Sequence, residues 1–429
     1  MKELFLVHIH NFTSASVLLA PALCRGAGFA HIQKGIQMAE NEIALRYGCN
    51  PHQKPARVFM RSGGALPFQV LNGAPGYINL LDALNSWQLV RELKQVLHLP
   101  AATSFKHVSP AGAALGLPLS ETLKQANGVD GLELSPLASA YARARGADRQ
   151  ASFGDWVALS DVVDVPTAQL IRREVSDGII APGYEPEALE LLRKKHQGRY
   201  TVLQIDQDYQ PQESERREVF GVTFEQKRND YVPGAEQLSE IPTKNRHLPE
   251  EAKRDLLLAL ITLKYTQSNS ICFTYDGQCI GIGAGQQSRI YCTRLAAGKA
   301  ANWYLRQHPT VQNLPWKQGV KRPDRTNGID LFLRDDLTAA EEQEWQQLFE
   351  KVPQRLSAEE KRAWLSGLQG VSLGSDAYIP FRDNVDFASQ YGVSYIVQPG
   401  GSIRDEDVIA ACDTYGMVMV FNGVRLFHH

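Results

Sequence analysis

Short apolar runs alternate with amphipathic helices from residue 78 to residue 205, and this alternation limits the fold more than any other feature of the sequence. Apolar residues recur at helical spacing across 78–97, and a buried strand is expected directly afterwards at 101–105. Strands that alternate with helices predict a parallel sheet built from β-α-β units. Further helices are expected at 135–146, 166–174 and 186–198, and further strands at 157–159, 178–181 and 200–205.

The second half of the chain predicts a related set of elements. A long amphipathic helix is expected at 250–264, and Asp276-Gly277 predicts a two-residue hairpin turn between strands at 271–275 and 278–282. Residues 206–249 are polar, and we expect them to form a long connection with one short strand at 219–224. Three more helices are expected at 293–307, 339–350 and 358–368.

A loose internal repeat relates the two halves. Asp161 is followed by a helix, a strand and Pro182-Gly183, and Asp383 is followed by the same order ending in Pro399-Gly400. Such self-similarity predicts two related α/β units. The predicted organisation is an N-terminal arm without clear periodicity at 1–40, a first unit at 41–205, the polar connection at 206–249, and a second unit with a helical insertion at 250–429.

Composition excludes several classes of protein. A net charge of −2 over 429 residues, with no block of basic residues, argues against nucleic-acid binding. The six cysteines are scattered and form no C-x-x-C pair, which is typical of reduced thiols in the cytosol. No stretch is apolar enough to span a membrane, and the mildly apolar run 17–23 lacks the basic residues that precede a signal-peptide core. We therefore expect a cytoplasmic protein.

Residues 104–114 contain the strongest candidate for chemistry. The expected strand ends in Lys106 and His107, and Ser109, Pro110 and Gly112 are then expected to break it. An imidazole titrates near neutral pH and can act as a general base, while a neighbouring ammonium can stabilise an oxyanion. The alternative is a solvated lysine next to a histidine that only completes a turn.

Other site patterns are weak or missing. Gly281, Gly283 and Gly285 form G-x-G-x-G, but the run follows a hairpin rather than the first strand of a β-α-β unit, so a dinucleotide site is rejected. These glycines either let the backbone approach a ligand or another chain closely, or form only a tight turn. The eleven histidines show no zinc-ligand spacing, and we expect no zinc.

Several ordered motifs over about 44–429 together resemble the transformylase domain of the bifunctional AICAR transformylase/IMP cyclohydrolase family. This set is highly specific because the motifs are long and occur in one order. The motifs lie at 46–53, 71–76, 104–113, 140–148, 174–184, 264–270, 283–289, 380–384 and 425–429.

The resemblance implies an enzyme of purine (IMP) biosynthesis that transfers a formyl group from 10-formyltetrahydrofolate to AICAR, giving FAICAR and tetrahydrofolate. It also implies two cytidine-deaminase-like α/β subdomains without zinc, with mixed sheets flanked by helices, and a homodimer whose active sites lie between chains. The alternative is a catalytically silent nucleotide- or folate-binding protein on the same fold. A zinc deaminase is disfavoured because its ligands are missing.

The resemblance also assigns roles to individual residues. His107 would be the base, Lys106 would stabilise the oxyanion or help to protonate the leaving nitrogen, and Asn269 would orient the reacting groups. The implied AICAR contacts are Arg46, Tyr47, Gly154, Asp177, Arg289, Tyr378 and Arg425. The implied folate contacts are Ile290, Asp383, Ser402 and Ile403. A potassium site would involve Leu263, Thr266, Ser268, Ser270, Asp376, Leu426 and His428.

Two features depart from the family pattern. Residues 1–40 do not resemble the cyclohydrolase domain, so we expect a separate protein to close FAICAR to IMP. Tyr378-Ile379 stands where two phenylalanines are expected, which affects packing near the folate.

Overall fold

The structure is a computed structural model that describes residues 41–429. The predicted arm at 1–40, with its apolar run at 17–23, lies outside the described residues. Within 41–429, no helix combines the length and the apolar character that a membrane crossing requires.

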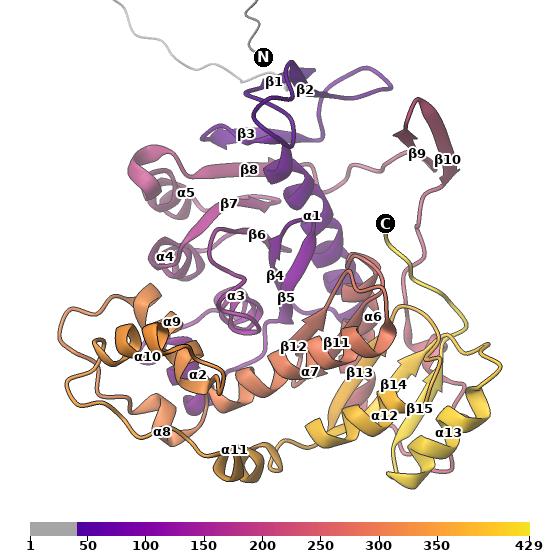
Figure 1. Ribbon diagram of the computed structural model, residues 1–429. Coiled ribbons are helices and arrows are strands. Elements are labelled where there is room, and N and C mark those ends of the chain that lie inside the picture. Colours follow the sequence, from indigo (N-terminus) through magenta and orange to yellow (C-terminus); the bar gives the residue numbers. More distant parts are fainter. Residues whose placement is uncertain (1–40) are drawn as a thin grey trace, which may run out of the picture. The chain divides into compact units, whose positions relative to one another are not determined.

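Eleven strands form one mixed sheet that continues through both halves of the chain (Figure 1). At its centre β5 and β12 run antiparallel, with Ala114 opposite Gln278. The order along the sheet is β3 (Phe68–Asn72), β8 (Thr201–Ile205), β7 (Ser176–Ala181), β6 (Asp155–Leu159), β4 (Ala101–Lys106), β5 (Ser109–Leu115), β12 (Gln278–Gly283), β11 (Ile271–Tyr275), β13 (Val371–Ser375), β14 (Val393–Gln398) and β15 (Val418–Phe421).

The two halves of the sheet repeat one pattern of strand pairing. Outward from the centre, β5-β4-β6 are paired antiparallel and β6-β7-β8 parallel, and β12-β11-β13 and β13-β14-β15 do the same. The predicted mixed α/β fold is therefore confirmed. The repeated order is compatible with a duplication, while the likeness to cytidine deaminases stays a prediction.

The helices follow the same repeat. In the first half they are α1 (Tyr77–Leu97), α3 (Pro136–Gly146), α4 (Val165–Arg173) and α5 (Pro186–Arg193). Their counterparts are α6 (Glu250–Lys264), α7 (Arg289–Leu305), α12 (Asp383–Ala388) and α13 (Asp405–Thr414). Successive strand residues point to opposite faces, so Ala101 packs in the core under α1 and α6, and Ala102 packs in the core under the other helices.

The strand β5 corrects the expectation of a break at 109–112. Its residues are small because α3 lies very close to it: a Cβ on Gly112 would be 2.1 Å from the carbonyl oxygen of Ala144. The turn between β4 and β5 consists of His107 and Val108, both left-handed with φ of 52° and 58°. Neither residue is the glycine or asparagine that signals such a turn, so the sequence did not reveal the hairpin.

The polar connection also differs from the prediction. The expected strand at 219–224 spans the turn of a hairpin, β9 (Ser214–Val219) and β10 (Val222–Lys227), which stands apart from the main sheet in Figure 1. Every residue of both strands is exposed, so the sequence shows no buried face that would indicate strands. Further along, the connection reaches the far edge of the sheet, where the Met419 N–H donates to Thr243 Oγ1 (3.1 Å).

Other boundaries shift by a few residues. The expected helix at 186–198 ends at Arg193 and is followed by η1 (Lys195–Gly198), and the helix expected from 293 already begins at Arg289. The insertion after α7 contains α8 (Pro309–Gln312), α9 (Arg322–Leu333), α10 (Ala339–Gln346) and α11 (Ala358–Leu365), of which α8 and α9 were not predicted. The remaining elements are β1 (Glu42–Leu45), β2 (Ala56–Phe59), α2 (Glu121–Asn127), η2 (Ala235–Leu238) and η3 (Ser389–Tyr391).

Two glycine-to-alanine substitutions test the close approach of α3 to β5. Gly112→Ala should lower the free energy of unfolding by about 1–3 kcal/mol or more, because the methyl group would overlap a helix carbonyl. Gly298→Ala, within α7, meets nothing within 4 Å and should raise it by about 0.5–1 kcal/mol. Urea unfolding of both variants measures the contrast, and equal effects would contradict this account of β5.

Candidate functional site

The turn after β4 presents the predicted catalytic pair. Lys106 is the last residue of the strand, and its Nζ donates a hydrogen bond to the carbonyl oxygen of Phe153 (2.5 Å). His107 is exposed at the tip of the turn. Val108 is β-branched, and its left-handed conformation costs on the order of 1–3 kcal/mol. The surrounding structure must therefore hold the turn in place.

Asp82 on α1 provides this support, and no motif or spacing in the sequence indicated this role. The Val108 N–H donates to Asp82 Oδ1 (2.7 Å), and only 5 % of Asp82 is exposed. Burial raises the pKa of Asp82 to about 6, although the hydrogen bond from Val108 and the charge of His107 act to lower this pKa. A buried carboxylate is thus kept beside the imidazole.

Two predicted nucleotide contacts lie beside this turn. Gly154 directly follows Phe153 and is left-handed with φ of 71°, and a Cβ there would lie 3.5 Å from Asp177 Oδ1. Burial raises the pKa of Asp177 on β7, while the charges of His196, Lys106 and Lys195 oppose that rise. The structure therefore brings Lys106, His107, Gly154 and Asp177 together at neighbouring strand ends.

A buried ion network lies behind these strand ends. Arg145 on α3 pairs with Asp155 (2.8 Å) and Glu174 (3.2 Å), and all three residues are at least nine-tenths buried. Asp155 Oδ2 also accepts from Ser104 Oγ (2.6 Å), which joins β6 to β4. Burial acts to raise the pKa of Glu174, but Arg149, Arg145 and Arg322 outweigh it and the pKa is lowered. The network fixes β4, β6 and the start of β7 relative to one another.

A second polar cluster surrounds Asn269 in the other half. The amide oxygen of Asn269 accepts from Arg289 Nη2 (2.8 Å), and its Nδ2 donates to the carbonyl oxygen of Gln286 (2.9 Å). Arg289 is buried and also forms an ion pair with Asp376, while its Nε–H has no hydrogen-bond partner within 41–429. The predicted nucleotide contact Arg289 is thus held by Asp376 and Asn269.

The residues of the predicted potassium site gather around the same aspartate. Asp376 Oδ2 accepts from Ser268 Oγ (2.6 Å) and from the Ser270 N–H (3.0 Å). The Leu426 N–H donates to the Asp376 carbonyl oxygen (2.8 Å), and the His428 N–H donates to Ser268 Oγ (3.0 Å). Leu263 and Thr266 are buried where α6 ends, and the Thr266 N–H donates to the Leu263 carbonyl oxygen (3.0 Å).

A hydrogen bond connects the segments that carry the two clusters. The Gln267 N–H donates to Ser109 Oγ (3.3 Å), and Ser109 follows the His107-Val108 turn directly. Gln267 lies two residues before Asn269. The structure therefore links the two segments near the centre of the sheet through Ser109 and Gln267, and not through a hydrogen bond between His107 and Asn269.

The remaining predicted nucleotide contacts lie on exposed segments. Arg46 follows β1, and its guanidinium carbon lies 5.8 Å from the ring centre of Tyr47. Arg425 stands over the ring of Phe427 and lines a cavity of about 700 Å³ with Lys264 and His428. Tyr378 is 49 % exposed. The structure does not join Arg46 or Arg425 to the catalytic turn.

The predicted folate contacts lie on three neighbouring segments of the second half. Ile290 is in the first turn of α7 and Asp383 begins α12, and these helices are tied by a hydrogen bond from Thr293 Oγ1 to Asn384 Oδ1 (2.8 Å). Ser402 and the fully exposed Ile403 precede α13. At the departure from the family pattern, Ile379 is buried and its N–H donates to Gln398 Oε1 (2.6 Å), whereas Tyr378 faces solvent.

The fold and these clusters define a mixed α/β protein with a cation–imidazole pair and a glycine–carboxylate pair at adjacent strand ends. The AICARFT/IMPCHase bienzyme family matches residues 18–299. The chain is 30% identical over 391 residues to the bifunctional purine biosynthesis protein PurH of Xylella fastidiosa (strain 9a5c). This match covers 90% of the chain and 58% of that relative's length. The chain belongs to the AICARFT/IMPCHase bienzyme family.

The raised pKa of Asp82 predicts a pH-dependent stability. In the unfolded chain this carboxyl titrates near 3.8, and in the folded protein near 6, so the folded state holds an extra proton between these values. The free energy of unfolding of the wild type minus that of Asp82→Asn should fall by about 2 kcal/mol as the pH rises from 4.5 to 7, and stay level above that. Urea unfolding at pH 4.5 and 7 measures it, with the exposed Asp324→Asn as control.

Proposed function

We propose that the protein transfers the formyl group of 10-formyltetrahydrofolate to the 5-amino group of AICAR. The observation that carries this proposal is the strained turn that holds Lys106 and His107 side by side, supported by Asp82 and adjacent to Gly154 and Asp177. Family membership supports the same reaction, since the matched family is named for AICAR transformylase and IMP cyclohydrolase activities.

The residues of the turn suit the chemistry of the transfer. The amine of AICAR attacks the formyl carbon, and its proton passes to His107, directly or through the neighbouring carboxamide. Lys106 stabilises the oxyanion of the tetrahedral intermediate. The bond from the formyl carbon to folate N10 then breaks as N10 takes up a proton. A new carbon–nitrogen bond has formed, and the products are FAICAR and tetrahydrofolate.

The surrounding residues would bind the two substrates. Gly154 lets a ligand approach the backbone beside Asp177, and Arg46, Tyr47 and Arg425 would hold the phosphate, for which arginine provides parallel hydrogen bonds. Asn269 and Arg289 would orient the reacting groups, with Tyr378 at the edge of the nucleotide site. The folate would lie along the segments that carry Ile290, Asp383, Ser402 and Ile403.

The residues around Asp376 fit a potassium ion. Ser270 is fully buried and its Oγ has no hydrogen-bond partner among the residues that the structure describes, as expected of an oxygen that binds a cation. Hydroxyl, carboxylate and carbonyl oxygens of the other members are close by, and such hard oxygens suit potassium. When bound, the ion would neutralise charge and steady the loop at 264–270, which carries Asn269.

A homodimer with shared sites also belongs to this proposal. The Arg46 and Arg425 side chains are exposed and lie apart from the catalytic turn, so a second chain could supply them. The closing of FAICAR to IMP by a separate protein and the cytoplasmic location stay predictions from the sequence.

The reaction is tested by tetrahydrofolate release from AICAR and 10-formyltetrahydrofolate. His107→Ala should lower kcat by about 100-fold or more, the usual contribution of a general base. The exposed His247→Ala is the matched control and should retain full turnover. Turnover that survives His107→Ala would remove His107 from the mechanism. No turnover in any variant, with AICAR still bound, would favour a silent binding protein.

The potassium site is tested by thermal unfolding. Potassium chloride should stabilise the wild type relative to choline chloride at equal ionic strength, by about 1.4 kcal/mol when potassium is tenfold above its Kd. Ser270→Ala should remove this difference. Ser372→Ala is the matched control, because Ser372 is equally buried and its Oγ also lacks a partner in the described part of the chain. A potassium effect that persists in Ser270→Ala would contradict the assignment.

A further inference from the structure

A cavity of about 400 Å³ lies between the first half and the helical insertion, among residues that the proposed reaction does not use. It is lined by residues at the end of α2, by Arg149 beyond α3, by the end of α4, and by α8 and α9. Its volume lies within the range of small-molecule sites, about 300–1,000 Å³. The charged residues that line it are Arg149, Arg173, Arg306, Arg322, Arg325 and Asp130.

Five of these six charged groups are cations, and the protein only partly neutralises them. Arg322 pairs with Glu174 (2.6 Å), and Arg149 lies 3.6 Å from the same carboxylate. Arg173 and Arg325 form no ion pair among the described residues. The five guanidinium groups form a cationic wall of the cavity, and the shared carboxylate of Glu174 and the carboxylate of Asp130 oppose their charge.

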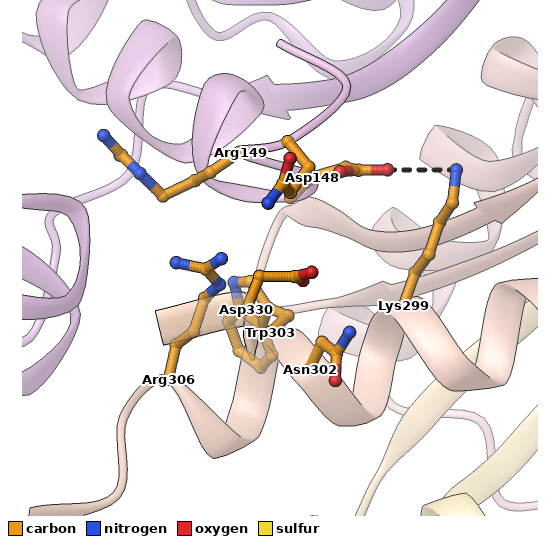
Figure 2. A pocket seen from close by; sticks show the side chains of 9 residues that line it. Asp148, Arg149, Lys299, Asn302, Trp303, Arg306 and Asp330 are labelled. Carbon is orange, nitrogen blue, oxygen red and sulfur yellow. Dashed lines mark ion pairs between the residues drawn. The ribbon is translucent and has the colours of Figure 1, made fainter. Parts of the chain in front are cut away.

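Arg306 is the most unusual member of this wall. It is only 8% exposed, and to the described residues its side chain donates a single long hydrogen bond, to the carbonyl oxygen of Thr326 (3.3 Å). Figure 2 shows the guanidinium groups of Arg306 and Arg149 on the same side of an adjoining small pocket, away from the Lys299–Asp148 ion pair. Burial, together with the charge of Arg149, lowers the pKa of Arg306 to about 10, while the charges of Asp330 and Asp148 act to raise it. An anion would relieve this unfavourable arrangement.

A buried amide adds an independent sign of a missing partner. Asn127 lines the cavity, is 3% exposed, and its Nδ2 has no hydrogen-bond partner among residues 41–429. Buried polar groups are nearly always hydrogen-bonded, so an unpaired donor at a cavity wall suggests an acceptor that these residues do not provide.

Part of the remaining lining is apolar, and it also includes polar side chains such as Gln125 and Gln312. Val311 and Ile329 line the cavity together with Trp316, whose ring packs against Phe349 with 4.7 Å between centres. The Arg325 guanidinium lies 5.9 Å from the Trp316 ring centre, so the cationic and apolar walls meet. A ligand that fills both walls would carry an anionic group at one end and a planar, apolar group at the other.

We propose that this cavity binds an organic phosphate of the size of a nucleoside monophosphate, with its phosphate on the arginines and its base against the apolar wall. Guanidinium groups bind phosphate through parallel charge-assisted hydrogen bonds, and several arginines can share its oxygens. The site is separate from the turn at Lys106 and His107, and the inference does not rest on the proposed reaction.

Calorimetric titration of the full chain at low salt tests this site, with AMP, inorganic phosphate and adenosine as probes. AMP should bind more tightly than phosphate, and adenosine should not bind measurably. In the double variant Arg173→Gln/Arg325→Gln, AMP should bind at least about 10-fold more weakly, because each charged hydrogen bond contributes about a factor of ten. Both residues are exposed, which keeps the substitutions clear of the core.

Two control variants separate this site from other sources of binding. Arg362→Gln removes an exposed arginine from α11 of the same insertion and should leave AMP affinity unchanged. Arg46→Gln alters the proposed substrate site and should leave binding to the cavity intact. No AMP binding in the wild type, or binding that Arg46→Gln abolishes and the double variant leaves unchanged, would overturn the proposal. Equal affinity for phosphate and AMP would overturn the role of the apolar wall.

Discussion

The pairing of Arg145 with Asp155 and Glu174 is the interaction on which the candidate site depends. All three groups are buried, and a charge in that environment is tolerated only when its partners stay in place. Through Ser104 the network holds β4 to β6, and through Glu174 it fixes the approach to β7. Lys106, Gly154 and Asp177 occupy the ends of these strands. Their mutual position follows from paired charges that are buried behind the strand ends.

The turn at His107 and Val108 is stabilised differently. Its backbone conformation is unfavourable, and a side chain from another element, Asp82 on α1, stabilises it. A positive φ is unfavourable for a β-branched residue such as Val108, and the hydrogen bond from the Val108 N–H to Asp82 stabilises this conformation. The carboxylate that does so is itself buried, and this burial raises its pKa. Strain, burial and a titratable group thus coincide at one point, which is typical of functional sites and unusual in purely structural turns.

Much of the fold was predictable because the spacing of apolar residues along the sequence indicates which face of each helix or strand is buried. The helix at 250–264 and the hairpin over Asp276-Gly277 were predicted within a residue, since one has a continuous apolar face and the other a turn dipeptide with a backbone reason. The strand β5 was missed because its residues are small. They are small because α3, a separate segment of the chain, packs closely against them. The hairpin β9–β10 was missed because it buries nothing. Among site residues, motifs indicated Lys106, His107 and Asn269, whereas Asp82 and the Arg145 network depend on contacts that no local pattern encodes.

The continuous sheet has a consequence for how such a chain can be divided. β5 and β12 meet at the centre with almost wholly buried residues, so cutting the connection at 206–249 would leave each fragment with a bare apolar edge. Cutting within the connection would also disturb the far edge of the sheet, because Thr243 of the connection accepts a hydrogen bond from the Met419 N–H there. Each half alone would present this edge to a second copy of itself. The antiparallel pairing of β5 with β12 joins two halves of one polypeptide here. Two half-length chains would pair side by side through the same arrangement of strands.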